Sequence, residues 1–365
     1  MTATWLQARR ILCVRLDSLG DVLMCTPAMR ALRQAVPGRT LTLLSSPSGA
    51  AALPFIPELD DAIAWSAPWT KSATPATASA TAPAPLATLA ARAFDAAVIF
   101  TTYTQSALPA ALLCQLAGIP LRLAHCRENP YDLLTDWVPE PEPATLVRHE
   151  VQRQLALVQR VGCRSADLGL SFVPRPADFT AARARLTAAG IDPDRPWILL
   201  HPGASAASRR YPAGHWAHVL RLLAQELQLP LVLTGSAEEC ELVDGIQFAS
   251  AVPAVSLAGR LALGELGAAL RLAAIVVTNN TGPAHMAAAV GTPVVDLYAL
   301  TNPQHTPWNV RSRVLFHDVP CRFCYRSTCP EGHQACLDGV APQRVVEAVR
   351  ELLGATQAAP AAVPT

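Results

Sequence analysis

The chain has 365 residues and a formal net charge of +1, and only 16% of its residues are charged. Such a chain lacks the basic excess of a general nucleic-acid binder, so we expect no nucleic-acid partner. No apolar run reaches the ~20 residues that span a bilayer, and residues 1–10 hold no signal-peptide core. We therefore expect a cytoplasmic protein, long enough for two domains of ordinary size.

The first half of the chain alternates strand-like and helix-like segments. An apolar strand at residues 10–16 is followed by a short polar loop at 17–21 and a helix over about 22–34. Further strands are predicted at residues 40–45, 94–100 and 121–126. This rhythm favours a parallel sheet with helices on both faces. Residues 66–91 consist mostly of Ala, Thr, Ser and Pro, which predicts a flexible insertion.

A second α/β series begins after a Pro-containing linker near residues 172–176. It is predicted to hold a helix at 177–189, strands at 197–200, 229–233, 273–277 and 293–298, and a helix at 340–353. The Ala/Pro-rich tail at 354–365 is expected to be disordered. We therefore predict an α/β protein of two Rossmann-like domains, residues 1–172 and 173–353, that face each other across a cleft.

The most informative segment is Thr-Asn-Asn-Thr-Gly-Pro-Ala-His at residues 278–285, directly after an apolar strand. The apolar stretch that follows predicts that a helix begins between Gly282 and His285. Two interpretations stay open. The segment is either an ordinary helix cap or an anion site, because the first turn of a helix presents free N–H groups.

Two other loops of the second half also follow strands. One spans residues 201–205 with arginines just beyond it at 209 and 210, and the other holds Thr234, Gly235 and Ser236 followed by Glu238 and Glu239. Glycine lets backbone amides approach a phosphate, arginine supplies charge, and a carboxylate can bind ribose hydroxyls. The three loops together predict a site for a nucleotide diphosphate.

In the first domain, no G-x-G-x-x-G follows the first strand, so a nicotinamide dinucleotide fingerprint is lacking. The loop instead carries Asp17 and Asp21 on either side of Gly20. Asp17 has a plain interpretation as a helix cap. Asp21 has two interpretations, a favourable charge at the helix dipole or a general base for an acceptor hydroxyl.

Four motifs in fixed order carry a resemblance to a known family. They are residues 16–23 (LDSLGDVL), 201–204 (HPGA), 209–212 (RRYP) and 278–285 (TNNTGPAH). Together they resemble the family 9 glycosyltransferases, the ADP-heptose:lipopolysaccharide heptosyltransferases. The likeness covers residues 10–353 apart from the Ala/Thr/Pro-rich insertion.

The resemblance implies a GT-B fold and an inverting, metal-independent transfer of heptose from ADP-heptose to the lipopolysaccharide inner core. Asp21 matches the family's catalytic base, and Ser18 and Gly20 belong to the acceptor-side loop. The residues that match the donor site are Ser205, Arg209, Glu238 (or Glu239, one position on), Asn280, Thr281, Gly282 and His285. A lipid-linked acceptor also implies peripheral contact with the cytoplasmic face of the inner membrane.

Two positions depart from the family pattern. Arg209 stands where a lysine is common, and it keeps the charge with a different geometry. Asn280 stands where many relatives have aspartate, which exchanges a negative charge for a hydrogen-bond donor and bears on the identity of the donor sugar. The alternative functions are a nucleotide-sugar epimerase of GT-B fold and a non-catalytic nucleotide-binding protein.

Four of the ten cysteines cluster near the end of the second domain. Cys321, Cys324, Cys329 and Cys336 enclose His333 within a short stretch. Disulfides are rare in the cytosol, which leaves a structural zinc or iron site or a set of reduced thiols. No cofactor is expected for catalysis.

Overall fold

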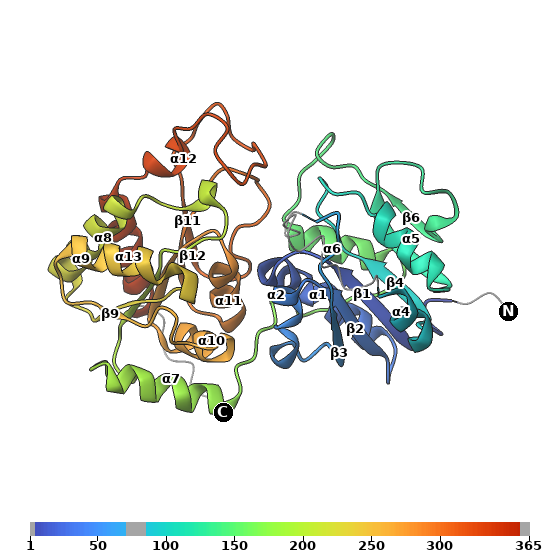
Figure 1. Cartoon of the computed structure of the whole chain (residues 1–365), viewed down its shortest axis with the longest axis horizontal. Helices are drawn as coiled ribbons and strands as arrows, with labels where there is room; N and C mark the ends of the chain where they lie inside the picture. The colour runs from blue at the N-terminus through green and yellow to red at the C-terminus, as the bar shows by residue number, and fades with distance from the viewer. Residues whose placement is uncertain (1–3, 71–84, 358–365) are drawn as a thin grey trace. The chain divides into compact units, whose positions relative to one another are not determined.

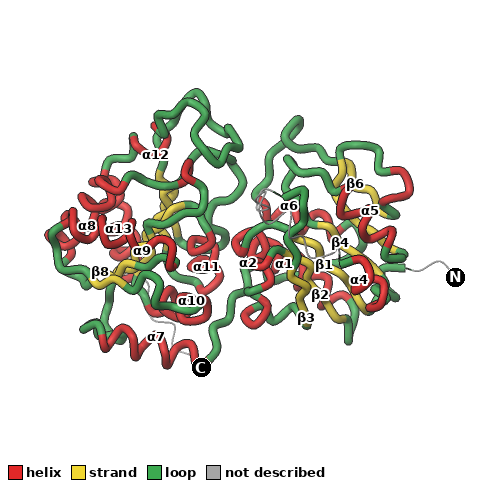
Figure 2. Tube along the Cα trace, in the orientation of Figure 1, coloured by secondary structure: helices red, strands yellow, loops and turns green. Residues whose placement is uncertain are grey.

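The computed structural model describes residues 4–70 and 85–357. The chain divides into two compact units, Met1–Phe172 and Val173–Thr365, each built around its own sheet. Figure 2 shows strands flanked by helices in each unit. No helix in the described ranges combines the length and the apolar character that a membrane crossing needs.

The first unit holds a six-stranded parallel sheet in the order β3-β2-β1-β4-β5-β6. It is coloured blue to green in Figure 1. Its strands are β1 (Arg10–Arg15), β2 (Thr40–Ser45), β3 (Asp61–Ala64), β4 (Ala96–Ile99), β5 (Leu121–Cys126) and β6 (Asp136–Pro139). Its α-helices are α1 (Leu19–Ala35), α2 (Pro47–Ala50), α4 (Leu86–Arg92), α5 (Leu108–Leu116) and α6 (Glu150–Gln159). Its 3₁₀ turns are η1 (Leu53–Phe55) and η2 (Tyr131–Leu133).

The second unit repeats this topology with the order β12-β11-β10-β7-β8-β9, again parallel throughout. Its strands are β7 (Ile198–His201), β8 (Leu231–Leu233), β9 (Val255–Ser256), β10 (Ile275–Asn279), β11 (Val294–Leu297) and β12 (Ser312–Leu315). Its α-helices are α7 (Pro176–Ala188), α8 (Ala213–Leu227), α9 (Cys240–Ser250), α10 (Leu263–Leu272), α11 (Gly282–Val290), α12 (Ala335–Asp338) and α13 (Pro342–Gln357). Its 3₁₀ turns are η3 (Ala207–Arg209) and η4 (Ala237–Glu239).

The central strands form because both of their faces are covered. Every residue of β4, β5, β7, β10 and β11 is buried, which explains why most of their residues are apolar. In each unit the first strand lies beside the fourth. The second and third strands extend the sheet on one side of this pair, and the fifth and sixth strands extend it on the other. Loops at the carboxyl ends of β1 and β4, and of β7 and β10, therefore lie at a topological switch point, where ligands bind in open α/β sheets.

Two predicted boundaries need correction. Residues 86–92 lie within the predicted insertion, yet they form α4, because Leu89 is fully buried in the core of the first unit. Residues 71–84 of that insertion lie outside the described residues. The final helix passes its predicted end at Leu353 and continues to Gln357, because Gly354 is tolerated inside it. The predicted disordered tail from 358 onward also lies outside the described residues.

Candidate active site

Asn279 ties together the loops at the switch point of the second unit. Its Nδ2 donates to the carbonyl oxygens of Pro202 at 2.7 Å and Gly203 at 3.2 Å. Its Oδ1 accepts from the backbone N–H of Tyr211 at 3.1 Å. One wholly buried amide thus fixes the loop after β7, the segment before α8 and the end of β10. The sequence prediction did not single out this residue, since it stands inside the motif beside more conspicuous side chains.

The N-terminus of α11 lies at this point, as predicted. Thr281 is the N-cap residue, but its side chain makes no capping hydrogen bond within the described part of the chain. Its hydroxyl donates instead to the carbonyl of Asn279 at 3.3 Å. The Thr281 side chain therefore does not cap the first turn of α11, which begins at Gly282, although the Thr281 carbonyl accepts from the Ala284 N–H at 3.0 Å. The missing side-chain cap favours the anion-site interpretation. His285 lies in the same helix and is 4% exposed.

The loop after β8 places Glu239, not Glu238, against the switch point. A Cβ built on Gly203 would lie 2.1 Å from the Glu239 carboxylate, so only glycine leaves room for it. The same carboxylate accepts from the backbone N–H of Ser236 at 2.8 Å and lies 3.7 Å from Nε2 of His201. Glu238 is exposed. The geometry therefore favours Glu239 for the acidic role that was assigned to Glu238.

The positively charged residue of the predicted donor site, Arg209, belongs to the 3₁₀ turn η3. Arg209 ends this turn and is half-buried, whereas Ser205 is exposed in the preceding loop. The turn is braced by the cysteine-containing loop: the Ser208 hydroxyl donates to the carbonyl of Arg326 at 2.7 Å, and Gln334 Nε2 donates to the carbonyl of Ala207 at 2.7 Å. The position of Arg209 thus depends on a segment more than a hundred residues away.

Asn280 is turned into the protein. It is 2% exposed, and its Nδ2 donates to Oδ2 of Asp296 at 3.2 Å and to the carbonyl of His305 at 2.7 Å. Both amide hydrogens therefore serve the fold. Asp296 is wholly buried, and burial raises its pKa to about 7, although the hydrogen bond from Asn280 and the charge of Arg209 lower it. The sequence prediction missed Asp296, since its only signal is an acid inside an apolar strand.

The four clustered cysteines come together around one small cavity. Cys321, Cys324, Cys329 and Cys336 line one cavity of about 20 Å³ together with His333. All four are free thiols, and among the described residues no group of three or more His, Cys, Asp or Glu is placed to hold a metal ion. The described residues therefore do not support the predicted zinc or iron site.

In the first unit, a buried arginine organises the loop after β1. Arg15 has a side chain with 0% exposure, and it lies 3.0 Å from Asp17 Oδ2, 3.1 Å from Asp21 Oδ1 and 2.8 Å from Glu150 Oε1. Burial alone would lower the pKa of Arg15, but the acidic groups around it, Asp17 first, raise it well above its ordinary value. The arginine is therefore a permanent positive charge that holds three carboxylates in place.

Asp21 lies in the first turn of α1, with its side chain 19% exposed. Its Oδ2 accepts from the Ser18 hydroxyl at 2.7 Å and from the Ser18 backbone N–H at 3.2 Å. Ser18 is the N-cap residue, so the helix begins at Leu19, earlier than predicted, and Gly20 belongs to its first turn rather than to the loop. The cap role proposed for Asp17 is wrong, because Ser18 occupies that position.

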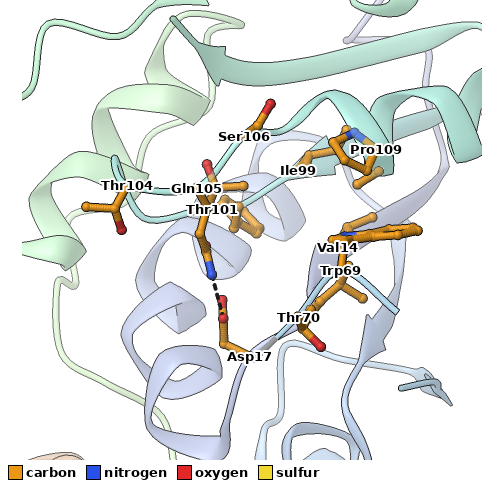
Figure 3. Close-up of a pocket in the computed structure, with 13 residues that line it drawn as sticks. Val14, Asp17, Trp69, Thr70, Ile99, Thr101, Thr104, Gln105, Ser106 and Pro109 are labelled. Carbon is orange, nitrogen blue, oxygen red and sulfur yellow. Dashed lines mark hydrogen bonds between the residues drawn. The ribbon is translucent and has the colours of Figure 1, made fainter. Parts of the chain in front are cut away.

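Asp17 instead lines a cavity of about 380 Å³ at the carboxyl ends of β1 and β4 (Figure 3). Its Oδ1 accepts from Gln105 Nε2 at 2.7 Å, the dashed line in Figure 3. Burial raises the pKa of Asp17, opposed by the charge of Arg15. Trp69 forms an aromatic wall of the cavity and packs edge-on against Trp65. The volume is in the range of small-molecule sites.

Residues 86–335 match the family model described as glycosyltransferase family 9 (heptosyltransferase). The chain belongs to this family. The fold is accordingly the predicted GT-B type, with two Rossmann-like domains. The family match covers all of the second unit's switch-point loops, but it begins after β1 and α1.

Three relatives show the extent of the likeness. Lipooligosaccharide heptosyltransferase 2 of Campylobacter jejuni is 28% identical over 159 residues, which are 42% of this chain and 50% of that protein. Lipopolysaccharide heptosyltransferase 1 of Escherichia coli K12 is 27% identical over 308 residues, 80% of this chain and 89% of that protein. The crystal structure of the family 9 glycosyltransferase from Veillonella parvula has a TM-score of 0.78 at 20% identity and covers 97% of this chain and 100% of that one. The chain spans about half the length of the first curated relatives that it matches.

Proposed function

We propose that this family 9 member is an inverting heptosyltransferase that moves a heptose from an ADP-sugar to a lipopolysaccharide inner-core acceptor. The observation that carries the proposal is the Asp21 carboxylate. It is held by Arg15 and Ser18 at the carboxyl end of β1, and it stays partly open to solvent. The curated relatives that this chain resembles are named as heptosyltransferases.

In the proposed reaction, Asp21 removes the proton from an acceptor hydroxyl. The acceptor oxygen then attacks the anomeric carbon from the face opposite the nucleotide, and the bond from that carbon to the diphosphate oxygen breaks. Negative charge develops on the departing ADP. Arg209 and the first-turn amides of α11 would stabilise this charge, as preorganised donors do in other active sites.

The nucleotide-sugar would bind at the switch point of the second unit. Glu239 lies at the loop after β8 and suits the ribose hydroxyls, while Thr281, Gly282 and His285 surround the helix N-terminus where the diphosphate would lie. We give Asn280 a supporting role in place of the predicted sugar contact, since both of its amide hydrogens are already used.

The acceptor would bind in the 380 Å³ cavity of the first unit, in the same loop region as Asp21. The face of Trp69 would pack on the C–H face of a sugar ring, and Asp17 with Gln105 would bind hydroxyls. Because such an acceptor is linked to lipid, we also propose that the enzyme contacts the membrane through its substrate.

The test is ADP release from ADP-heptose with a lipid-free inner-core fragment as acceptor. Asp21→Asn preserves the size of the side chain, and we expect it to reduce kcat by about 10²–10⁴-fold, the usual range for loss of a general base. Asp60→Asn, which alters a surface ion pair with Arg33, serves as the control and should leave the rate unchanged. An undiminished rate in a folded Asp21→Asn protein would refute the base assignment.

The same assay separates the alternatives. Turnover of the nucleotide-sugar without any acceptor would indicate an epimerase. Tight ADP binding with no transfer over a broad acceptor panel would indicate a non-catalytic nucleotide-binding protein.

A further inference from the structure

Glu150 is a wholly buried carboxylate that the proposed mechanism does not use. It is the first residue of α6, and its side chain has 0% exposure. Its Oε1 accepts from Nη1 of Arg15 at 2.8 Å and from Nε2 of Gln154 at 2.8 Å. The same nitrogen of Gln154 donates to the carbonyl of Thr101 at 2.8 Å, in the segment after β4. Gln154 therefore ties the Glu150 carboxylate to the end of β4.

The guanidinium of Arg15 divides its three nitrogens among three carboxylates. Nη1 donates to Glu150, Nη2 donates to Asp21 at 3.1 Å, and Nε lies 3.0 Å from Asp17 Oδ2. Because the guanidinium is planar and rigid, the carboxylates on Nη1 and Nη2 stay at a fixed separation. The Arg15 side chain is wholly buried, so water screens these charges little, and each carboxylate affects the proton affinity of the others.

The titratable groups that interact with Arg15 come from the loop after β1, from α1 and from α6. They are Asp17, Asp21, Cys25 and Glu150. Burial raises the pKa of the Cys25 thiol, which therefore stays neutral. One buried cation thus faces three carboxylates, and this excess of negative charge favours the uptake of a proton.

The titratable residues near Glu150 on α6 are engaged with other groups. His149, the N-cap residue, accepts at Nδ1 from the backbone N–H of Val151 at 3.2 Å. Arg153 is paired with Glu140 and donates to the carbonyl of Thr101. The charge of Glu150 therefore acts chiefly on Arg15 and on the carboxylates around it.

We propose that Glu150 is a positioning residue that keeps Asp21 basic enough to take the acceptor proton. Arg15 favours the ionised form of Asp21, which by itself weakens Asp21 as a base. The negative charge of Glu150, held on the adjacent nitrogen of the same guanidinium, offsets this effect. The inference rests on the proposed function, in which Asp21 is the base.

Glu150 also supplies a counter-charge during proton transfer. The acceptor O–H bond breaks, and the proton bonds to a carboxylate oxygen of Asp21. The electron pair stays on the acceptor oxygen, which forms the bond to the anomeric carbon. Asp21 is then neutral, but Glu150 and Asp17 remain beside Arg15. The step therefore leaves no unpaired cation in the interior, which would be costly.

The first test is the pH profile of kcat/KM for ADP release with a lipid-free inner-core fragment, because its acid limb reports the ionisation of the base. Glu150→Gln keeps the size of the side chain and removes its charge. It should move the acid limb to lower pH by about one unit and lower the plateau severalfold. Glu150→Asp retains the charge, so its acid limb should stay at the wild-type position even where the plateau falls.

The control is Glu58, another glutamate of the first unit that is buried against an arginine. Its Oε1 accepts from Nε of Arg30 at 2.9 Å, and Arg30 lies on α1, the helix that carries Asp21. Glu58→Gln should leave the acid limb in place. An acid limb of Glu150→Gln that is unmoved, or that moves to higher pH, would show that Glu150 serves only the fold, and the inference would be wrong.

The second test follows the wild-type protein by NMR of its labelled carboxyl carbons, so it needs no transfer activity. The resonances are assigned by comparison with Asp21→Asn and Glu150→Asp. Glu150 should keep the chemical shift of a carboxylate while Asp21 takes up its proton. If Glu150 takes up a proton first, it has no charge with which to offset Arg15, and the inference is overturned. Absence of ADP release from a protein with the expected order of protonation would instead refute the proposed function.

Discussion

The buried carboxyl of Asp296 in the second unit should make the stability of the protein depend on pH. Its side chain has 0% exposure, and burial raises its pKa from 3.8 to about 7, against the opposing effects of Asn280 and Arg209. In the unfolded chain the carboxyl ionises near its ordinary value. The folded protein therefore binds more protons between these two pKa values, and its free energy of unfolding falls as the pH rises through this window.

The size of the stability change follows from the shift in the pKa of Asp296. At about 1.4 kcal/mol per pKa unit, moving the pKa from 3.8 to about 7 is worth about 4 kcal/mol in total. About 2.5 kcal/mol of this effect falls between about pH 5 and about pH 8. Asp296→Asn imitates the protonated form at every pH, so the variant should lack this part of the pH dependence.

The assay is urea unfolding at both pH values, combined with hydrogen exchange of the β10 and β11 amides so that the second unit is observed. The wild-type free energy of unfolding should fall by about 2.5 kcal/mol more than that of Asp296→Asn between about pH 5 and about pH 8. Asp244→Asn, an exposed aspartate on α9, should follow the wild type. If the free energies of unfolding of the wild type and of Asp296→Asn differ by the same amount at both pH values, the reasoning is refuted. The pKa of the Asp296 carboxyl would then not be raised in the folded protein.

Three further predictions concern binding and stability. Gly203→Ala places a methyl group 2.1 Å from the Glu239 carboxylate. The flexible Glu239 side chain should move aside, so that the affinity for ADP falls about tenfold with little change in Tm. The control variant Gly214→Ala, which has open space around the new methyl group, should bind ADP normally. Trp69→Ala should raise KM for the acceptor about tenfold with kcat little changed, and an equal fall in kcat would argue against a binding wall. Arg15→Met should reduce the free energy of unfolding by about 3–5 kcal/mol, because it removes the cation from a buried carboxylate at Glu150. Adding Glu150→Leu should recover most of that loss in chemical unfolding, and a double variant no more stable than the single one would contradict this account.

The central strands could be predicted from the sequence because burial on both faces gives a continuous apolar run. The strand predicted at residues 94–100 contains β4, Ala96–Ile99, and all four residues of β4 are apolar and buried. The edge strands β3, β6, β9 and β12 were not predicted. Their residues are mostly half-buried or exposed, so the sequence pattern carries little apolar signal.

The loops of the candidate site could be located from the sequence, but the partners of their side chains could not. Turn residues after apolar runs indicate where strands end, and this placed residues 278–285 correctly at the start of a helix. The choice between Glu238 and Glu239 depended on one position of register, which only the approach of Gly203 decides. Arg15, Glu150 and Asp296 carry no local signal, because a buried ionisable group is defined by neighbours that are distant in sequence.

The two units bury side chains of opposite charge on different strands of the same topology, Arg15 on the first strand of one and Asp296 on the fifth strand of the other. In the first unit, a wholly buried arginine lies below the loop after β1 and holds carboxylates, one of which remains partly exposed in the first turn of α1. In the second unit, a wholly buried aspartate lies on β11 beside the loop after β10, and it interacts with the partly buried Arg209. Each buried charge favours a more accessible partner of opposite sign, the Asp21 carboxylate in one unit and the Arg209 guanidinium in the other, which are the base and the phosphate-binding cation of the proposed function. A proton acceptor for one substrate and a counter-charge for the phosphates of another are what transfer from a nucleotide-sugar requires, and the repeated topology supplies one frame for each.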